Sequence, residues 1–184
     1  PAPAGKQDLA AAIDPTVSCV VVQTPDFYGR LHDLTALADK AHAVGALLVA
    51  VFTEPVSLGL VQPPGAMGAD IVVGEGEGIG NALAFGGPYV GLFTCRIGFI
   101  RQMPGRIVGR TTDLDGRTAY VLTLQTREQH IRRERATSNI CTSQQLVGLA
   151  ATVYLATVGK HGLRQIAEAC YHKAHYAASL IARI

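Results

Sequence analysis

Apolar residues along this chain fall mainly into short, continuous runs rich in Val, Ile and Leu. Such runs are typical of strands that are buried on both faces of a parallel sheet. Between the first two runs, apolar side chains repeat with helical spacing from residue 31 to 44, and Gly45 follows as a stop signal. The sequence therefore predicts an α/β fold with a mainly parallel sheet, in which a right-handed helical crossover joins the first two strands. The predicted strands cover residues 17–23, 46–52, 69–73 and 89–95.

The pattern changes after residue 95. Residues 96–126 are expected to form loops and one hairpin, whose turn we place at Asp115-Gly116. Helical periodicity returns behind two capping boxes, Thr126-Arg-Glu-Gln and Thr142-Ser-Gln-Gln. Three helices are therefore predicted in this half, beginning at 126, 142 and 163, and the second of them ends near Gly159.

Length and composition narrow the class of protein. A chain of 184 residues corresponds to about one domain, and 48% hydrophobic against 16% charged residues excludes a disordered chain. No run approaches the 18 or more apolar residues typical of a membrane span, so no membrane association is predicted. The four cysteines form no CxxC pair, which favours scattered reduced thiols. The last residues stop inside helical periodicity, and we expect a fragment of a longer chain.

Charge is distributed unevenly along the chain. Residues 1–95 carry 3 basic and 9 acidic side chains, a net charge of −6. Residues 96–135 carry 9 arginines and 4 acids, a net charge of +5. The basic stretch contains no Lys/Arg run and no RNA-binding motif, and only 6% of all residues are aromatic. We therefore predict no nucleic-acid binding.

The glycine-rich segment 74–80 resembles a nucleotide loop but has the wrong spacing for GxGxxG. It also contains Glu75 and Glu77, which would repel a pyrophosphate. Two readings stay open for it, a structural loop and a loop that contacts a ligand or partner through Gly76 and Gly78. No HExxH, HxH or GxSxG motif is present, so neither a metal site nor a serine hydrolase is predicted.

The densest polar segment runs from Arg127 to Thr142. One interpretation is a solvated, charged helix. The other is a pocket or interface, because hydroxyl and amide side chains follow the arginines at an expected helix boundary, where backbone N–H groups favour an anion. The candidate residues for that role are Arg127, His130, Arg133, Thr137, Ser138 and Asn139.

Several longer motifs resemble one family. They are Met67-Gly-Ala-Asp-Ile-Val-Val-Gly-Glu-Gly, Phe85-Gly-Gly-Pro-Tyr-Val-Gly, Met103-Pro-Gly-Arg, Leu122-Thr-Leu-Gln-Thr-Arg-Glu-Gln-His-Ile-Arg-Arg-Glu and Ala136-Thr-Ser-Asn-Ile-Cys-Thr. On these the chain resembles subunit 1, the amino-terminal half, of the glycine cleavage system P protein. The resemblance implies part of a fold type I pyridoxal-phosphate enzyme. Residues 1–140 would be the second half of its large α/β domain, and 141–184 would be helices leading towards the small C-terminal domain.

The same resemblance implies a reaction. P proteins decarboxylate glycine on pyridoxal phosphate and pass the aminomethyl group to the lipoylated H protein. Such enzymes need a lysine after the third predicted strand and an acid at the end of the second. Gly78 and Val51 occupy those places, and Glu54 lies three residues too late. We therefore expect no catalytic residue in this chain.

The expected role is that of a non-lysine-bearing subunit of glycine dehydrogenase (decarboxylating), inactive alone. Its implied partners are P protein subunit 2, which would hold the pyridoxal phosphate, together with H protein and glycine. The alternative is a non-catalytic scaffold or binding module of the same fold. The expected location is the cytoplasm of a bacterium or archaeon, or the mitochondrion of a eukaryote.

Overall fold

The computed structural model describes residues 8–136 and 144–183. The chain divides into two compact units. The first comprises the residues up to Cys95 together with those from Gln144 onward, and the second comprises residues 96–143. The expected division at residue 140 into parts of a large and a small domain stays a prediction.

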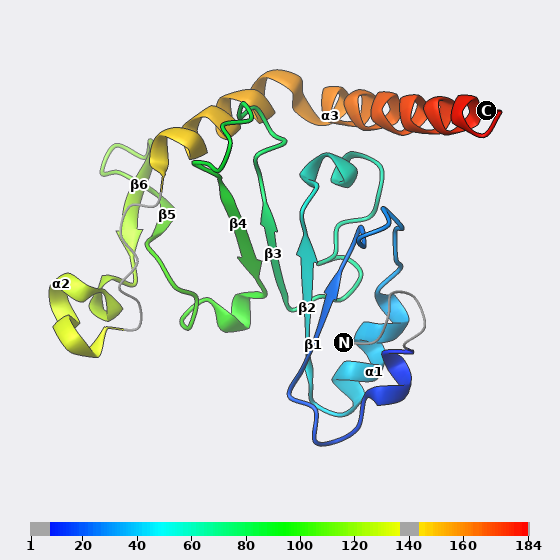
Figure 1. Cartoon of the computed structure of the whole chain (residues 1–184). Coiled ribbons are helices and arrows are strands. Elements are labelled where there is room, and N and C mark those ends of the chain that lie inside the picture. The colour runs from blue at the N-terminus through cyan, green and yellow to red at the C-terminus, as the bar shows by residue number, and fades with distance from the viewer. Residues whose placement is uncertain (1–7, 137–143, 184) are drawn as a thin grey trace. The chain divides into compact units, whose positions relative to one another are not determined.

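A four-stranded mixed sheet forms the centre of the first unit (Figure 1). Strands β1, β2 and β3 are parallel, with Val21 opposite Val49 and Val49 opposite Ile71, which confirms the predicted parallel arrangement. The fourth strand, β4, runs antiparallel to β3. The strands lie in the order β1-β2-β3-β4 and cover Cys19–Gln23, Leu47–Phe52, Ile71–Glu75 and Gly91–Cys95.

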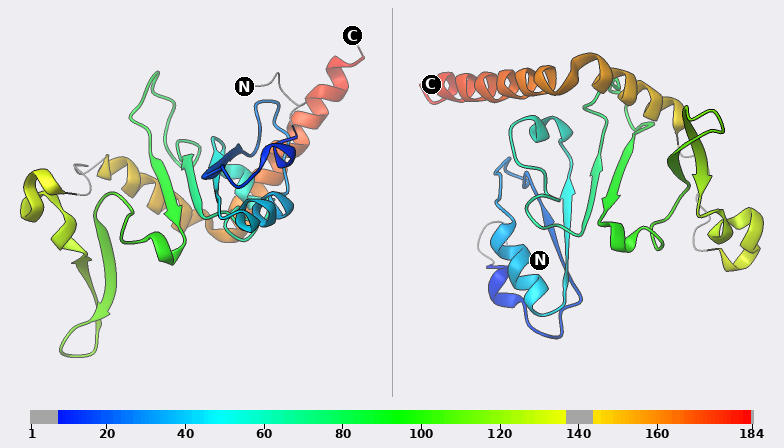
Figure 2. Two further views of the ribbon diagram at one scale, coloured as in Figure 1. Left: turned by 90° about the horizontal axis from the view of Figure 1, so that it is seen from below. Right: turned by 180° about the vertical axis from the view of Figure 1, so that it is seen from behind.

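Helix α1 (Thr35–Ala43) connects β1 to β2 and packs against the part of the sheet formed by these two strands (Figure 2). Its Ala38 and Ala41 are buried against Leu48 and Ala50 of β2, and these small side chains let the helix lie close to the strand. The helix begins later than predicted. Residue 32 is held outside it, because the backbone N–H of His32 donates to Thr24 Oγ1 at 3.2 Å.

A buried carboxylate joins three elements at the amino ends of the parallel strands. Asp70, just before β3, accepts hydrogen bonds from the backbone N–H of Leu48 and from His42 Nε2, both at 2.8 Å. Its side chain is only 4% exposed. Because both donors lie in earlier elements, this carboxylate holds α1, β2 and β3 together at the amino end of the sheet.

The long helix α3 (Gln145–Ile181) passes the carboxyl ends of the parallel strands (Figure 1). Gly159 has a non-helical backbone (φ 59°), which confirms the predicted stop, although the helix resumes at once. A Cβ at Gly59, in the 3₁₀ helix η2 (Pro55–Gly59), would lie only 2.8 Å from the carbonyl oxygen of Leu163. Glycine at that position therefore permits η2 to touch α3.

By length and composition α3 is long and apolar enough to cross a membrane. The break at Gly159, however, divides it into two segments. The first, 145–158, is shorter than the ~20 residues that a span needs. The second carries Lys160, Arg164, Glu168 and Lys173, so neither segment is an uninterrupted apolar span.

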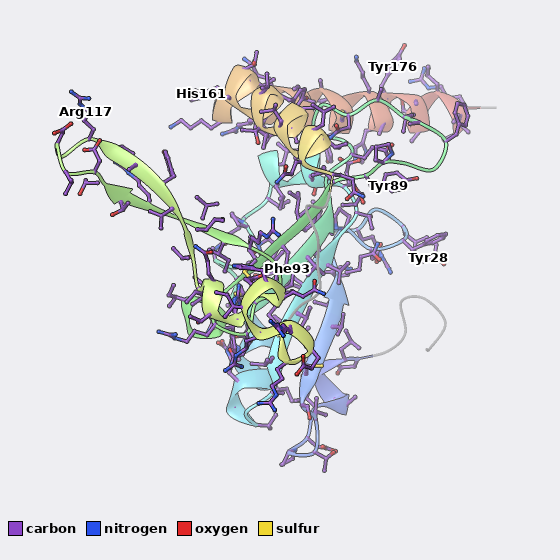
Figure 3. The ribbon with its side chains drawn as sticks, turned by 90° about the vertical axis from the view of Figure 1, so that its left-hand side faces the viewer. Tyr28, Tyr89, Phe93, Arg117, His161 and Tyr176 are labelled. Carbon is purple, nitrogen blue, oxygen red and sulfur yellow. The ribbon has the colours of Figure 1, made fainter. Side chains whose placement is uncertain are left out.

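The second unit contains the predicted hairpin, made of β5 (Ile107–Thr112) and β6 (Thr118–Thr123). Its turn includes Asp115-Gly116 as expected, and Arg117 lies at its tip (Figure 3). The helix predicted from residue 126 is wrong. Residues 125–127 form a 3₁₀ turn, and α2 covers only Gln129–Arg132 without a side-chain cap.

The helix start predicted at Thr142 lies outside the described residues. Helix α3 begins at Gln145 after Gln144, which has a left-handed backbone and forms no side-chain cap. The remaining short elements are 3₁₀ turns, namely η1 (Ala10–Ala12), η3 (Ile97–Phe99), η4 (Gln125–Arg127) and η5 (Arg133–Arg135).

Candidate functional site

The carboxyl edge of the parallel strands is the place where α/β sheets bind ligands. Three loops leave the strands there, namely residues 24–34 after β1, 53–62 after β2 and 76–90 after β3. Within three residues of each strand end, at 26, 54 and 75, stands an acidic side chain. We call these three loops, together with Glu75, the carboxyl edge.

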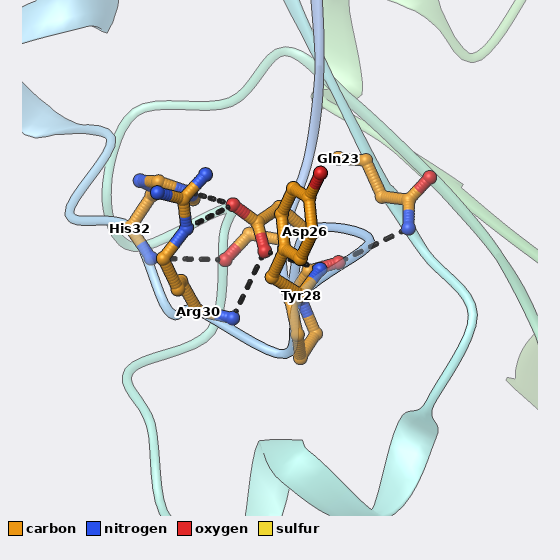
Figure 4. Close-up of polar contacts among 7 residues, drawn as sticks. Gln23, Asp26, Tyr28, Arg30 and His32 are labelled. Atoms are coloured by element: carbon orange, nitrogen blue, oxygen red, sulfur yellow. Dashed lines mark hydrogen bonds and ion pairs between the residues drawn. The ribbon is translucent and has the colours of Figure 1, made fainter. Parts of the chain in front are cut away.

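Asp26 organises the first loop (Figure 4). Its carboxylate accepts the backbone N–H groups of Tyr28 (2.9 Å) and Arg30 (3.0 Å), the guanidinium of Arg30 (2.7 Å) and the ring of His32 (3.2 Å). Partial burial raises the pKa of this carboxyl, but the hydrogen bonds from Arg30, His32 and Tyr28 outweigh that effect and hold the pKa well below its usual range. Asp26 is therefore ionised and committed to its own loop.

The same loop presents two aromatic rings outward. Phe27 and Tyr28 are 90% and 63% exposed and meet edge to face, with 5.5 Å between the ring centroids. Figure 3 shows Tyr28 pointing away from the body of its unit. The guanidinium of Arg30 lies 5.3 Å from the Tyr28 ring centroid, so a cation–π contact also fixes the ring.

Glu54 caps the second loop. One carboxylate oxygen, Oε1, accepts the backbone N–H of Val56 at 3.0 Å and so begins the 3₁₀ helix η2. Among the described residues no ion pair neutralises this carboxylate. A Cβ placed on Gly78 would lie 3.2 Å from Glu54 Oε1, which puts the third loop directly beside it.

The carboxylate of Glu75 is hydrogen-bonded inside the glycine-rich third loop. Its Oε1 accepts three backbone N–H groups, those of Gly76 (2.9 Å), Glu77 (3.0 Å) and Val90 (3.1 Å). The N–H of Gly76 also reaches the carbonyl of Val90, 2.7 Å away, and a Cβ at Gly76 would collide with the Val90 side chain. Clustered backbone N–H groups of this kind can bind an anion, but here a carboxylate of the same chain already uses them.

The carboxyl edge is therefore unfavourable for an anion. Its residues carry five acids and one arginine, a net charge of −4 with His32 neutral. Sequence reasoning considered Glu75 and Glu54 separately and did not combine them with Asp26 into one acidic edge. The recurring acid at positions 26, 54 and 75 was the available signal.

A cavity of about 450 Å³ lies where η2, the first and third loops and α3 meet. Its walls are mainly apolar, and its polar side chains are Glu54, Ser57, Cys170 and Tyr171. No lysine or arginine among the described residues lines it. The principal apolar wall residues are Leu31, Val56, Leu60, Ile166 and Ala167.

The positions expected to hold a lysine and an acid in a catalytic relative can now be placed. Gly78 is exposed beside Glu54, and Val51 lies within β2. Lys40 stands on α1, whereas Lys160 and Lys173 stand on α3, and all three are exposed. In the part of the chain that the structure describes, no amine faces the cavity.

Arg127 occupies the interior of the second unit and is 9% exposed. Its guanidinium donates to the carbonyls of Ile100 (3.3 Å), Arg101 (3.1 Å), Met103 and Gly105 (2.9 Å). The buried carboxylate of Glu128 lies 3.6 Å from its Nε. Arg127 therefore binds its own unit's backbone, a role that the expected helix did not suggest.

The other candidates of the basic segment are placed differently. His130 and Arg133 are exposed, and Arg133 has a left-handed backbone (φ 53°) that ends α2. Thr137, Ser138 and Asn139 lie outside the described residues. Within the described residues no group of three His, Cys, Asp or Glu side chains is arranged to hold a metal ion.

The chain is similar to one family over almost its whole length. The family model described as "Glycine cleavage system P-protein" matches residues 4–184. "Probable glycine dehydrogenase (decarboxylating) subunit 1" from Xanthobacter autotrophicus is 64% identical over 169 residues, which cover 92% of this chain and 38% of that protein. The protein of the same name from Azorhizobium caulinodans is 62% identical over 167 residues, or 91% and 37% of the two chains.

A solved structure of the same family is also similar to this chain. The "Crystal structure of glycine decarboxylase (P-protein) of the glycine cleavage system, in inhibitor-bound form" superimposes with a TM-score of 0.78 at 50% identity, over 83% of this chain and 35% of that one. This match confirms the expected α/β fold of fold type I. The chain spans less than two-fifths of the length of these relatives.

Proposed function

The chain belongs to the glycine cleavage system P-protein family, and we propose that it acts as the non-catalytic half of a glycine decarboxylase. In this role it assembles with a second P-protein subunit, which carries the reactive lysine. The assembly decarboxylates glycine and transfers the aminomethyl group to lipoylated H protein. The names of the relatives support the first part of this proposal, because they are called subunit 1.

The observation that carries the proposal is the chemistry of the carboxyl edge. The family depends on pyridoxal phosphate, which needs an amine for its aldehyde, an acid for its ring nitrogen and N–H donors for its phosphate. Here no amine lines the cavity, and Glu75 occupies the loop N–H groups. The cofactor does not fit this chain, so we place it in the partner subunit.

The contribution of this chain is then to support the partner's site. The glycine loop through the exposed Gly78 and the segment 127–139 would each contact the partner, whereas Gly76 is buried within its loop. Since Arg127 is buried, His130 and Arg133 are the described candidate residues of that segment that are exposed for contact. Bacterial relatives support a location in the cytoplasm of a bacterium.

Mixing experiments test the assignment. The chain is incubated with pyridoxal phosphate, alone and with subunit 2, and absorbance near the visible band of a lysine adduct is recorded. We expect the band and glycine decarboxylation only in the mixture. Borohydride reduction and peptide mapping should then label subunit 2, and stoichiometric labelling of Lys40, Lys160 or Lys173 would contradict the proposal.

The interface is tested by Arg133→Ala, with Arg117→Ala as the matched control on the hairpin. We expect Arg133→Ala to weaken assembly with subunit 2 or lower the decarboxylation rate, whereas the control changes neither. Equal rates and equal assembly for both variants would remove support for this face. Activity of the chain without subunit 2 would favour a self-sufficient enzyme instead.

A further inference from the structure

The cavity at the carboxyl edge combines two properties that together define a ligand class. Leu31, Leu60 and Ile166 contribute apolar surface to its walls, and Glu54 contributes a carboxylate. Its volume of about 450 Å³ lies within the range of small-molecule sites. Because no arginine or lysine of the described residues lines it, none of these wall residues balances the charge of the carboxylate.

Glu54 is available for a further contact. Its Oε1 holds the Val56 N–H at 3.0 Å, and no described residue donates to Oε2 or forms an ion pair with the side chain. A carboxylate fixed through one oxygen and free at the other is oriented to accept a charged donor. Gly78 leaves open the space immediately next to it.

The loops around the cavity also favour a positively charged ligand. The carboxylates of Asp26 and Glu75 consume five backbone N–H groups, which removes the donors that an anion would need. The edge has a net charge of −4. An anionic ligand would therefore meet repulsion without compensating hydrogen bonds, whereas a cation would be attracted.

We propose that this cavity binds an organic cation, an ammonium or guanidinium group carried on an apolar stem. The stem lies against the apolar walls, and the charged head binds the carboxylate of Glu54. Long cationic side chains and alkylamines share this division into an apolar stem and a charged head. The proposal rests on the lining of the cavity in this chain and does not depend on the proposed function.

The test is a methyl NMR titration of the full 184-residue chain with hexylammonium, hexanoate and hexanol. We expect hexylammonium to shift the methyl signals of Leu60 and Ile166 saturably and to bind at least tenfold more tightly than hexanoate, with hexanol between them. Equal affinity for the two ions, or shifts confined to other parts of the chain, would overturn the proposal.

Two variants that each remove one negative charge test whether binding depends on the carboxylate of Glu54 itself. Glu54→Gln keeps an acceptor for Val56 but removes the charge, and should weaken hexylammonium about tenfold or more while leaving hexanol unchanged. Glu77→Gln removes the same charge from the edge outside the cavity lining and should have little effect. If the two variants weaken binding equally, the site is only a diffuse negative field and the proposal fails.

A steric variant tests whether the ligand occupies the space beside Glu54. Gly78→Val adds bulk beside Glu54 without changing charge, and should weaken the binding of hexylammonium and hexanol alike.

Repeating the titration on the chain assembled with subunit 2 distinguishes two sources of the cation. Loss of hexylammonium binding identifies a lysine or arginine of the partner as the occupant, whereas retained binding identifies a free amine. No binding by the isolated chain refutes the proposal.

Discussion

Replacing Arg127 by alanine should unfold the second unit while leaving the first intact. The guanidinium joins four backbone carbonyls between residues 100 and 105, and the side chain is 9% exposed. Its removal leaves those carbonyls short of donors and the buried carboxylate of Glu128 without its cation. Both effects cost free energy because the groups stay buried.

The magnitude follows from these contacts. Hydrogen bonds to charged groups contribute about 1.5–3 kcal/mol each but do not add independently. Breaking a buried pair costs about 3–5 kcal/mol, which we expect for Arg127→Ala. A unit of roughly fifty residues has a total stability of about 2–7 kcal/mol at the usual stability per residue. The loss is therefore comparable with the entire stability of the unit.

Hydrogen exchange read by mass spectrometry measures the effect locally. In Arg127→Ala we expect the amides of β5 and β6 to lose most of their protection, whereas those of β1 to β3 keep theirs. Arg133→Ala is the matched control, since this arginine is exposed and should change stability by less than about 0.5 kcal/mol. Unchanged protection of the hairpin in Arg127→Ala would refute the structural role given to Arg127.

Three further outcomes are expected. Asp70→Ala should lower the free energy of unfolding of the first unit by about 1–3 kcal/mol in urea denaturation, because the buried Leu48 N–H loses its acceptor. Asp39→Ala, at an exposed position of α1, should not. Gly59→Val should detach η2 from α3 and increase proteolysis of α3, whereas unchanged proteolysis would contradict the close packing. The Asp26 carboxyl should titrate below its ordinary pKa of 3.8 by NMR. Because its folded-state pKa is lowered, the stability that it contributes is present above that ordinary value and is lost as the pH falls through the lowered one.

Local pattern was enough to predict the strands and the hairpin. Continuous apolar runs located β1 to β3, and Asp115-Gly116 located the turn between β5 and β6. The antiparallel direction of β4 could not be read from its sequence, because apolar runs do not encode strand direction. The capping box at Thr126 failed because a tertiary contact, the insertion of Arg127 among distant carbonyls, outweighs local helix preference.

The site was predictable only in part. The absence of a lysine after β3 followed directly from the sequence and supported the view of a non-catalytic chain. The environments of Asp26, Glu54 and Glu75 could not be derived, since the sequence does not reveal which backbone donors a carboxylate reaches in a folded loop. The cavity also required the structure, because residues near 30, 57 and 167 meet there from distant parts of the chain.

Glu75 also limits what can be built at this loop. Its side chain is an internal substitute for a bound anion, so the third loop keeps its shape without any ligand. Removing it would leave the N–H groups of Glu77 and Val90 without this acceptor, whereas that of Gly76 would keep the Val90 carbonyl. An anion site made here by substitution would therefore have to satisfy those donors itself, and the shape of the loop would depend on its ligand.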